Sequence, residues 1–485
     1  MNYKMMGRVC SMILAITATF MAPSMILSIF DGEKRAAIAF LATMLGMYAI
    51  AALLALLSRG AKRDFYAREG LITVSLGWIL MSALGCLPLC LSGEIPRYVD
   101  AFFEIVSGFT TTGASVVAVP EELSRGILLW RSFTHWLGGM GVLVFLLALV
   151  PLNGKNEGFT MHLLRAESPG PDVGKLVPRM RQTAMVLYAT YIALSVLDLI
   201  FLLAGGMPTF DAFCTMFGTA GTGGFGIKSD SMAGYSPYIQ NVTTVFLLLF
   251  GVNFSCYYLL LLRNLRSVVR DEELRLYFGI VATSIVLIAW NLRDVYGSLG
   301  ETVRHAAFQV ASIITTAGFA STDFDLWPTF SRVILLALMF VGACAGSTGG
   351  GIKVSRILLY IKGAHRNIMQ MIQPQKVKVI RVNKKPVSET IVANTNAYLA
   401  IYVLILIVST ILVSLDNFSP MSNFSAVLSC FNNIGPGLEA VGPTCNYGGY
   451  SDLSKLVLIF DMLAGRLEIF PILVLFSPRS WKRSK

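Results

Sequence analysis

Ten strongly apolar segments constrain what this chain can fold into. They lie at residues 9–30, 36–57, 71–91, 127–152, 184–203, 242–262, 276–292, 333–344, 391–415 and 453–476. Most approach the roughly 20 residues that an α-helix needs to cross a hydrocarbon core about 30 Å thick. The chain is 55% hydrophobic and only 14% charged, which is outside the range of soluble domains. Because lipid offers the backbone no hydrogen-bond partner, we predict an all-α integral membrane protein.

Basic residues indicate the orientation of these helices. Lysine and arginine follow the second segment and return at residues 155–181, 263–275, 353–385 and 479–485. By the positive-inside tendency these stretches face the cytoplasm, and so do both termini. The first segment follows Lys4 and Arg8 but is too long for a secretory signal, so we interpret it as a retained helix. This topology explains most of the net charge of +11, and we expect no nucleic-acid partner.

Residues that could carry enzyme chemistry are scattered along the chain. Cys86 and Cys90 stand one helical turn apart, but no histidine or second cysteine pair accompanies them to complete a zinc site. We therefore interpret them as small buried apolar residues. The four histidines lie far apart in the sequence, and no nucleophile elbow is present. We predict that the protein is not an enzyme.

A polar interruption between apolar segments occurs four times. The copies are DAFFEIVSGFTTTG (residues 100–113), DAFCTMFGTAGTGG (211–224), HAAFQVASIITTAG (305–318) and SNFSAVLSCFNNIG (422–435). They have equal length and end in glycine, and their spacing leaves room for one spanning helix before and one after every copy. This repetition predicts four pseudo-symmetric helix, pore-helix-loop, helix repeats around one pore, plus two extra N-terminal transmembrane helices. The expected domains are residues 1–62, 63–178, 179–270, 271–385 and 386–485.

Each copy is too short to cross the membrane. Part of it can form a short helix, with Asp100, Asp211 or Ser422 as the N-terminal cap. Such a segment enters and leaves by the same face, which is tolerated only where protein or a water-filled cavity covers the backbone. The carbonyl ends of four such helices then face one axis, which favours a cation there.

The closing glycines indicate how the backbone could hold an ion. To turn successive carbonyls toward one axis, the chain must alternate between ordinary and left-handed backbone angles, and glycine adopts the latter at little cost. A ring of four such loops can replace the water shell of an alkali ion. The alternative for any single copy is a small-residue motif for helix packing. Four copies in register favour an ion filter.

The repeats resemble the membrane subunit of the bacterial Trk and Ktr potassium-uptake systems, and the length and two extra helices resemble the Trk branch. The resemblance covers nearly the whole chain. It implies potassium (K+) as the transported ion, a homodimer with one pore in each protomer, and a location in the bacterial inner membrane. It also implies a cytosolic, TrkA-like regulatory ring (RCK/KTN) that carries the nucleotide, so we expect no cofactor bound to this chain.

The resemblance assigns the last four residues of each copy to the selectivity filter. These residues are Thr110, Thr111, Thr112 and Gly113; Gly221, Thr222, Gly223 and Gly224; Thr315, Thr316, Ala317 and Gly318; and Asn432, Asn433, Ile434 and Gly435. Gly113 stands where some sodium-passing relatives have serine, which favours potassium. The copies lack the longer Thr-Val-Gly-Tyr-Gly of potassium channels, so we expect weaker discrimination against sodium. Asn432 and Asn433 replace threonines, which leaves the inner ring of hydroxyls incomplete.

A glycine-rich stretch follows the third copy. Its residues Gly346, Ser347, Thr348, Gly349, Gly350 and Gly351 hold a helix poorly. A phosphate-binding loop is disfavoured because Ile352 separates the glycines from Lys353 and no strand precedes them. We predict a non-helical segment that crosses beneath the filter, and the resemblance implies that such a loop obstructs the pore. The alternative is a simple kink between packed helices.

Arg466 lies near the middle of the last apolar segment. A cation there costs roughly 2.5 to 3.5 kcal/mol on insertion scales, so it should face the pore or a partner. We predict that it projects below the filter as a positive barrier to cations, and the resemblance implies the same role. A salt bridge to Glu104 or Glu439 is the alternative. Glu468 is two residues away and points to a different side of a helix.

The predicted function is potassium uptake through a channel-like filter, driven by the membrane potential and gated from the cytoplasm. The basic stretches at residues 153–181 and 353–385 are candidate docking surfaces for an inside partner or for anionic lipid headgroups. A secondary symporter with broken helices is the main alternative, and it would show two repeats rather than four. An ATP-driven subunit is a further alternative, against which Ile352 argues.

Overall fold

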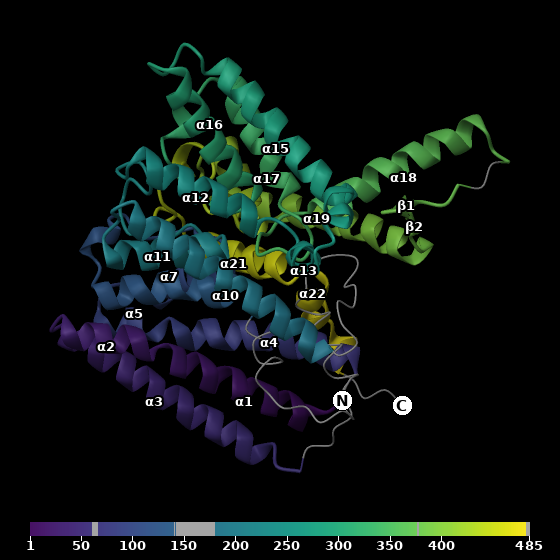
Figure 1. Ribbon diagram of the computed structural model, residues 1–485. Helices are drawn as coiled ribbons and strands as arrows, with labels where there is room; N and C mark the ends of the chain where they lie inside the picture. The colour runs from purple at the N-terminus through teal and green to yellow at the C-terminus, as the bar shows by residue number, and fades with distance from the viewer. Residues whose placement is uncertain (61–65, 140, 142–179, 376–377, 482–485) are drawn as a thin grey trace.

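Two N-terminal spans lie at the edge of a helical protein. The computed structural model describes residues 1–60, 66–139, 141, 180–375 and 378–481. The first span breaks at Met21 between α1 (Tyr3–Phe20) and α2 (Ala22–Phe30), and the second span is α3 (Lys34–Leu57). Pro23 lies in the first turn of α2, where its missing amide hydrogen and fixed φ explain the break. Figure 1 shows these helices packed along one edge of the molecule.

Four repeats follow, each with a helix, a short pore helix and a second helix. The first contains α4 (Ala67–Gly85), α5 (Leu87–Ser92), α6 (Tyr98–Phe109) and α7 (Arg125–Gly139), and the second contains α10 (Met180–Ala204), α11 (Thr209–Gly221), α12 (Pro237–Phe250), α13 (Phe254–Leu261) and α14 (Leu265–Val269). The third contains α15 (Glu272–Asn291), α16 (Leu299–Ile314), α17 (Thr329–Val341) and α18 (Val354–Ile372), and the fourth contains α19 (Glu389–Val413), α20 (Pro420–Phe431), α21 (Asp452–Arg466) and α22 (Phe470–Phe476). The pore helices are α6, α11, α16 and α20, which confirms the predicted fold class.

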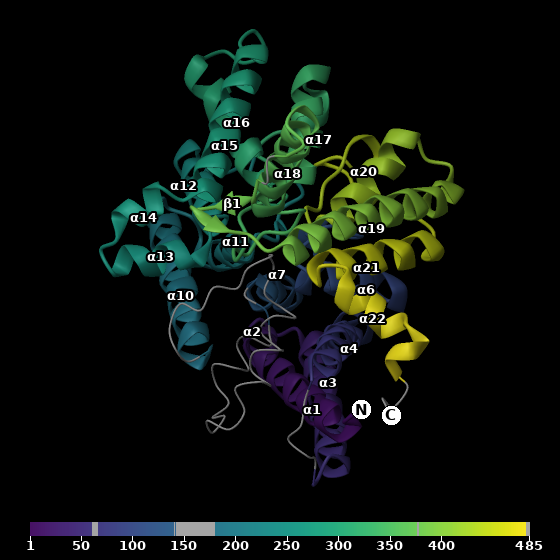
Figure 2. The same ribbon diagram turned by 90° about the vertical axis from the view of Figure 1, so that its right-hand side faces the viewer.

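Short elements complete the described part of the chain. Its 3-10 turns are η1 (Pro120–Glu122), η2 (Phe324–Leu326), η3 (Ser414–Asp416), η4 (Glu439–Val441) and η5 (Pro478–Trp481). Its strands, β1 (Arg381–Val382) and β2 (Lys385–Pro386), form one antiparallel hairpin between α18 and α19. Figure 2 shows the second, third, fourth and first repeats following one another around the centre, with α1 and α3 outside the first repeat.

In the second and fourth repeats, the second helix is shorter than its apolar segment predicts. Among the described residues, six helices are long and apolar enough to span a membrane, or seven if the bent pair α12 and α13 counts as one. The bend in that pair is 89°. The predicted helix at 453–476 breaks between α21 and α22, where Glu468 and Ile469 have φ of 58° and 65°. Of the segment at 127–152, α7 lies in the described residues and residues 142–152 lie outside them.

The predicted caps of the pore helices are wrong by one turn. Asp100, Asp211 and Ser422 are each the third helical residue, because the helices begin at Tyr98, Thr209 and Pro420. For α20 the cap is Ser419, whose side chain accepts a hydrogen bond from the amide of Ser422. The two aspartates lie in the first turn, where the helix dipole favours them, and they hold neighbouring segments. Asp100 pairs with Lys455 at 2.6 Å, and Asp211 accepts from the Tyr235 hydroxyl at 2.7 Å.

Candidate ion filter and gate

The last four residues of each copy, here named a filter turn, have the same backbone conformation in all four repeats. The second residue has a left-handed φ in every turn: Thr111 (55°), Thr222 (52°), Thr316 (61°) and Asn433 (56°). So does the fourth residue: Gly113 (79°), Gly224 (73°), Gly318 (79°) and Gly435 (102°). The predicted alternation of backbone angles is present in each turn. Glycine provides only half of it, because threonine or asparagine occupies the other left-handed position.

Two backbone hydrogen bonds fix each filter turn to its pore helix. The amide of the third residue donates to the carbonyl five residues earlier: Thr112 to Ser107, Gly223 to Gly218 and Ala317 to Ser312 at 2.8 Å, and Ile434 to Ser429 at 2.9 Å. The amide of the second residue donates to the carbonyl three residues earlier, at 3.1 Å or 3.2 Å. This pair of bonds is the Schellman pattern that ends many helices. Each filter turn is therefore also the C-terminal cap of its pore helix.

The four filter turns contact one another in a closed order. Each contact joins the fourth residue of one turn to the third residue of the next. A Cβ added to Gly113 would lie 2.1 Å from the carbonyl oxygen of Gly223, one on Gly224 would lie 1.8 Å from that of Ala317, one on Gly318 would lie 1.9 Å from that of Ile434, and one on Gly435 would lie 2.7 Å from that of Thr112. The turns therefore form a ring, and backbone oxygens occupy the space that any side chain would need.

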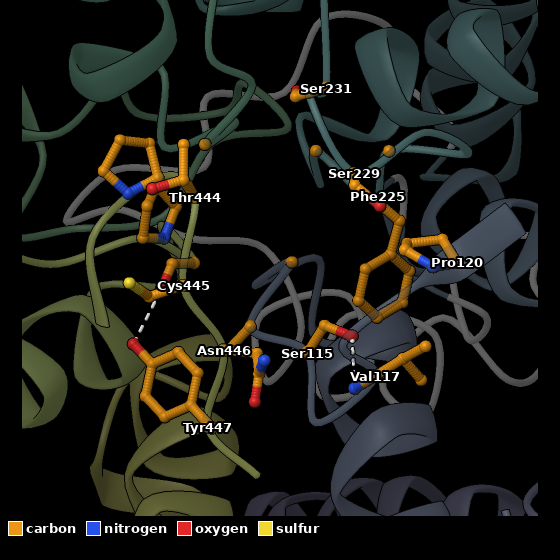
Figure 3. Close-up of a pocket in the computed structure, with 18 of the residues that line it drawn as sticks. Ser115, Val117, Pro120, Phe225, Ser229, Ser231, Thr444, Cys445, Asn446 and Tyr447 are labelled. Carbon is orange, nitrogen blue, oxygen red and sulfur yellow. Dashed lines mark hydrogen bonds between the residues drawn. The ribbon is translucent and has the colours of Figure 1, made fainter. Parts of the chain in front are cut away.

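A cavity opens on one side of this ring, at the glycines of the filter turns (Figure 3). Its volume is 100 Å³, which is enough for several water molecules. The glycines of all four filter turns line it, together with residues that follow the first, second and fourth turns. Figure 3 shows Ser115, Phe225 and Asn446 around the open space. The Tyr447 hydroxyl donates to the carbonyl of Gly435 at 2.7 Å, so the outer end departs from fourfold symmetry.

Side chains at the first position of the filter turns bind back to their own helices. Thr110 and Thr315 each donate to the carbonyl four residues earlier at 2.7 Å, and Asn432 does the same through its amide at 2.9 Å. Asparagine thus replaces threonine as a cap of the pore helix. Gly221 is the corresponding residue of the second turn and has no side chain. At this position only two of the four turns carry a hydroxyl, those of Thr110 and Thr315.

In three of the four turns, the side chain at the second position contacts an element beneath the ring. Thr316 Oγ1 accepts from the amide of Gly350 at 2.6 Å. Thr111 Oγ1 accepts from Arg466 at 3.3 Å. Asn433 Nδ2 donates to the carbonyl of Met462 at 2.9 Å. Glycine would adopt the left-handed angle more easily, but it would lose these contacts.

Buried ion pairs that the sequence reasoning missed hold the first pore helix. Arg131 of α7 and Glu104 of α6 are joined by bonds of 2.8 Å and 2.6 Å, and their side chains are 1% and 0% exposed. The pair of Lys455 with Asp100 joins the fourth repeat to the first. Arg131 and Lys455 both lie within or at the start of apolar segments. The rule that singled out Arg466, that a charge in an apolar segment needs a partner, would have found them as well.

His135 joins the first pore helix to the residue that follows the second filter turn. Its Nδ1 lies 2.8 Å from the carbonyl of Gly108, and its Nε2 accepts from the amide of Phe225 at 3.2 Å. These partners fit a neutral imidazole that donates through Nδ1. The sequence reasoning considered His135 only as a metal ligand and missed this structural role.

The glycine-rich stretch lies against one side of the ring of filter turns. Helix α17 ends at Val341 and α18 begins at Val354, and the residues between them are not helical. A Cβ added to Gly349 would lie 2.7 Å from the carbonyl oxygen of Thr315, and one on Gly350 would lie 2.4 Å from that of Asn432. We call Gly346, Ser347, Thr348, Gly349, Gly350 and Gly351 the gate loop. These contacts place the loop against the first residues of two filter turns, which a simple kink between helices would not do.

Hydrogen bonds hold the gate loop at its ends. Phe254 donates through its amide to the carbonyl of Gly346 at 3.0 Å, and the Ser347 hydroxyl donates to the carbonyl of Cys344 at 2.7 Å. The amide of Ala345 donates to the Glu273 carboxylate at 2.6 Å. The ammonium of Lys353, whose residue is 2% exposed, donates to the carbonyl of Gly349. Neither Glu273 nor Lys353 was recognised from the sequence, because their contacts depend on the fold.

Arg466 reaches the gate loop and the ring from the last repeat. Its guanidinium donates to the carbonyl of Thr348 at 2.9 Å, to that of Gly139 at 2.8 Å and to that of Gly138. It also donates to Thr111 in the first filter turn. These bonds place a cation directly beneath the ring.

The salt bridge considered for Arg466 is wrong. Glu104 pairs with Arg131, and Glu439 accepts from the Ser422 hydroxyl at 3.0 Å. Glu468 pairs instead with Arg356 at the start of α18, in agreement with its expected direction away from Arg466.

One ring of backbone oxygens, closed by four pore-helix turns and crossed by a loop on its inner side, defines a multi-pass membrane transport protein. The family model described as "TrkH: Cation transport protein" matches residues 37–483. The Trk system potassium uptake protein TrkH of Salmonella typhimurium is 36% identical over 99% of this chain and 100% of its own length. TrkG of Escherichia coli is 31% identical over 99% of both chains.

A solved structure gives the same result. The crystal structure of the potassium transporter TrkH from Vibrio parahaemolyticus matches with a TM-score of 0.87 and 32% identity, over 99% of this chain and 100% of that one. The chain belongs to the TrkH family of cation transport proteins. The resemblance to the Trk branch is confirmed, and so is the prediction of a transport protein rather than an enzyme.

Proposed function

We propose that this protein takes up potassium ions through the ring of filter turns. The closed order of contacts between the fourth and third residues of successive turns carries this proposal, because it joins main-chain oxygens from four repeats in one ring. Such oxygens can replace the water shell of a bare alkali ion. The relatives in Salmonella and Escherichia coli are named as potassium uptake proteins, which supports potassium as the ion. The membrane potential supplies about 2.3 kcal/mol per charge at 100 mV.

The gate loop and Arg466 close this path in the proposed mechanism. The loop lies against Thr315 and Asn432 on the inner side of the ring, so it must move before an ion can leave inward. Arg466 adds a positive charge to the same place and holds the loop through Thr348. Lys353 holds the same loop through the carbonyl of Gly349, and Arg356 is paired with Glu468. The excess of positive charge raises the energy of a cation below the ring.

The remaining features of the proposal concern assembly and orientation. We propose a homodimer in the bacterial inner membrane, with both termini in the cytoplasm and one pore in each protomer. A cytosolic, nucleotide-binding ring protein of the TrkA kind would move the gate loop, and the nucleotide would bind to that partner. We also propose that the two N-terminal helices and the four repeats meet at residues 62/63, 178/179, 270/271 and 385/386, of which the first two boundaries lie outside the described residues.

A symporter with broken helices is the second candidate. The 89° bend between α12 and α13 favours it, because such breaks also form ion sites in symporters. The two candidates differ in whether flux needs a second ion.

Isotope flux into liposomes that contain this protein alone tests the proposal. We expect potassium and rubidium to enter much faster than lithium, with sodium between them, and flux to follow the membrane potential without a second ion. Equal rates for all four ions would contradict the filter. A strict requirement for a proton or sodium gradient would favour the symporter.

A further inference from the structure

A basic cavity lies apart from the filter and the gate loop. It measures 660 Å³ and is formed by α18 and the residues that lead into β1. Its lining consists of Ile361, Lys362, His365, Arg366, Lys378, Val379, Ile380 and Arg381. Figure 1 shows α18, β1 and β2 on the side of the molecule where the N-terminus lies. In the proposed orientation this is the cytoplasmic side.

Two ion pairs fix the depth of the cavity relative to the membrane. Lys362 pairs with Glu272, the first residue of α15, and Arg366 pairs with Glu389, the first residue of α19, at 2.6 Å. Helices α15 and α19 are both long and apolar enough to span the membrane. The cavity is therefore level with the inner ends of two spans, where the headgroups of the inner leaflet lie.

The charge of the cavity is only partly compensated. Glu272 and Glu389 neutralise Lys362 and Arg366, respectively. Lys378 and Arg381 take part in no salt bridge within the described residues. They provide donors that fit a phosphate, and a guanidinium can bind its oxygens in pairs.

The walls of the cavity favour a lipid over a dissolved anion. Ile361 and Val379 line it and are 55% and 51% exposed. Exposed apolar side chains beside basic ones match a phospholipid, whose phosphate is attached to an apolar body. Basic pockets on the cytoplasmic side of membrane helices commonly bind anionic headgroups.

We propose that this cavity binds the phosphate of an anionic phospholipid of the inner leaflet. Lys378 and Arg381 hold the phosphate, with His365 beside them, and Ile361 and Val379 contact the apolar part of the lipid. Helix α18 begins directly after the gate loop, so a lipid bound here holds the helix that carries the loop. The binding itself needs no ion transport, and its test is independent of the proposed function.

Binding of fluorescent phosphatidylglycerol to the purified full chain in detergent tests the proposal, with fluorescent phosphatidylcholine for comparison. The double variant K378Q/R381Q removes two charges but keeps the bond from Lys362 to the main-chain carbonyl of residue 381. We expect it to weaken phosphatidylglycerol binding more than tenfold. The matched control is R266Q/R270Q, which removes two exposed arginines outside the cavity and should change binding little.

Three results would overturn the proposal. These are equal binding of phosphatidylcholine, unchanged binding by K378Q/R381Q, and an equal loss in R266Q/R270Q. Displacement of the lipid by inorganic phosphate at equal concentration would assign the cavity to a free anion instead. Thermal unfolding of each variant in detergent checks that a loss of binding does not come from a loss of folding.

Discussion

At the scale of single residues, the filter turns depend on backbone angles more than on side-chain chemistry. The closing glycines predicted a left-handed backbone angle at the fourth position of each turn. The structure adds a second reason for glycine there, because a carbonyl oxygen of the neighbouring turn occupies the space of a side chain. The left-handed second position was not predicted, because threonine, which occupies it in three of the four turns, rarely adopts such an angle. Its side chains contact Arg466, the gate loop and α21, and these contacts come from residues far away in the sequence.

Replacing Gly113 by serine should reduce the preference for potassium over sodium. The added Cβ would lie 2.1 Å from the carbonyl oxygen of Gly223, so that oxygen must move. We expect the ratio of rubidium to sodium flux in liposomes to fall about tenfold, equal to 1.4 kcal/mol. The matched control is Gly93→Ser, which has a similar φ of 85° but nothing within 4 Å of its Cβ position. A flux ratio in G113S equal to that in G93S would contradict the role of the ring.

Replacing Glu104 by glutamine should destabilise the fold. The change leaves Arg131 buried without its charge partner, which costs about 3 to 5 kcal/mol in other proteins. Thermal unfolding in detergent should show a clearly lower midpoint. Asp294→Asn breaks the exposed pair with Arg293 and should change the midpoint little. Equal shifts in the two variants would show that burial of the Arg131 pair is not what stabilises the first repeat.

Replacing Arg466 by alanine should raise basal flux several-fold in the absence of any partner protein. The change removes both the positive charge beneath the ring and the bond to Thr348 of the gate loop. Arg466→Lys keeps the charge but cannot make the same set of bonds. If charge is the main barrier, R466K should stay close to the wild type. Unchanged or lower flux in R466A would argue against a barrier at this residue.

At the scale of elements, the sequence predicted the pore helices better than the helices around them. Four copies of equal length indicated four short helices, and their existence was confirmed. The three starts predicted from caps were wrong by one turn, and Asp100 and Asp211 form tertiary contacts instead of caps. The breaks before α13 and α22 were missed, since both interrupt apolar segments that read as continuous helices.

Shortening the gate loop should leave the pore less well closed. Deletion of Gly349 and Gly350 removes the residues that approach the first position of the third and fourth filter turns. We expect higher rubidium flux than in the intact chain, measured without any partner. Deletion of Gly297, whose surroundings are open and which lies in the link between α15 and α16, serves as the control. Flux that stays unchanged in the gate-loop deletion would show that the loop does not obstruct the path.

At the scale of the whole molecule, the four copies in the sequence predicted the architecture. The contacts that close the ring of filter turns are seen only in the structure. The sequence predicted one axis from four copies, which needs no knowledge of contacts. It could not predict that Lys455 would join the fourth repeat to the first, or that His135 would join the first pore helix to Phe225 of the second repeat. Such contacts form between residues distant in sequence and follow from the assembled fold.

The position of bound ions is the most direct test of the ring. Anomalous diffraction from crystals soaked in rubidium or thallium would locate them. We expect peaks on the axis within the ring, bounded by the main-chain oxygens of Thr112, Gly223, Ala317 and Ile434. Peaks only in the outer cavity, or none near the filter turns, would contradict a filter made of backbone oxygens.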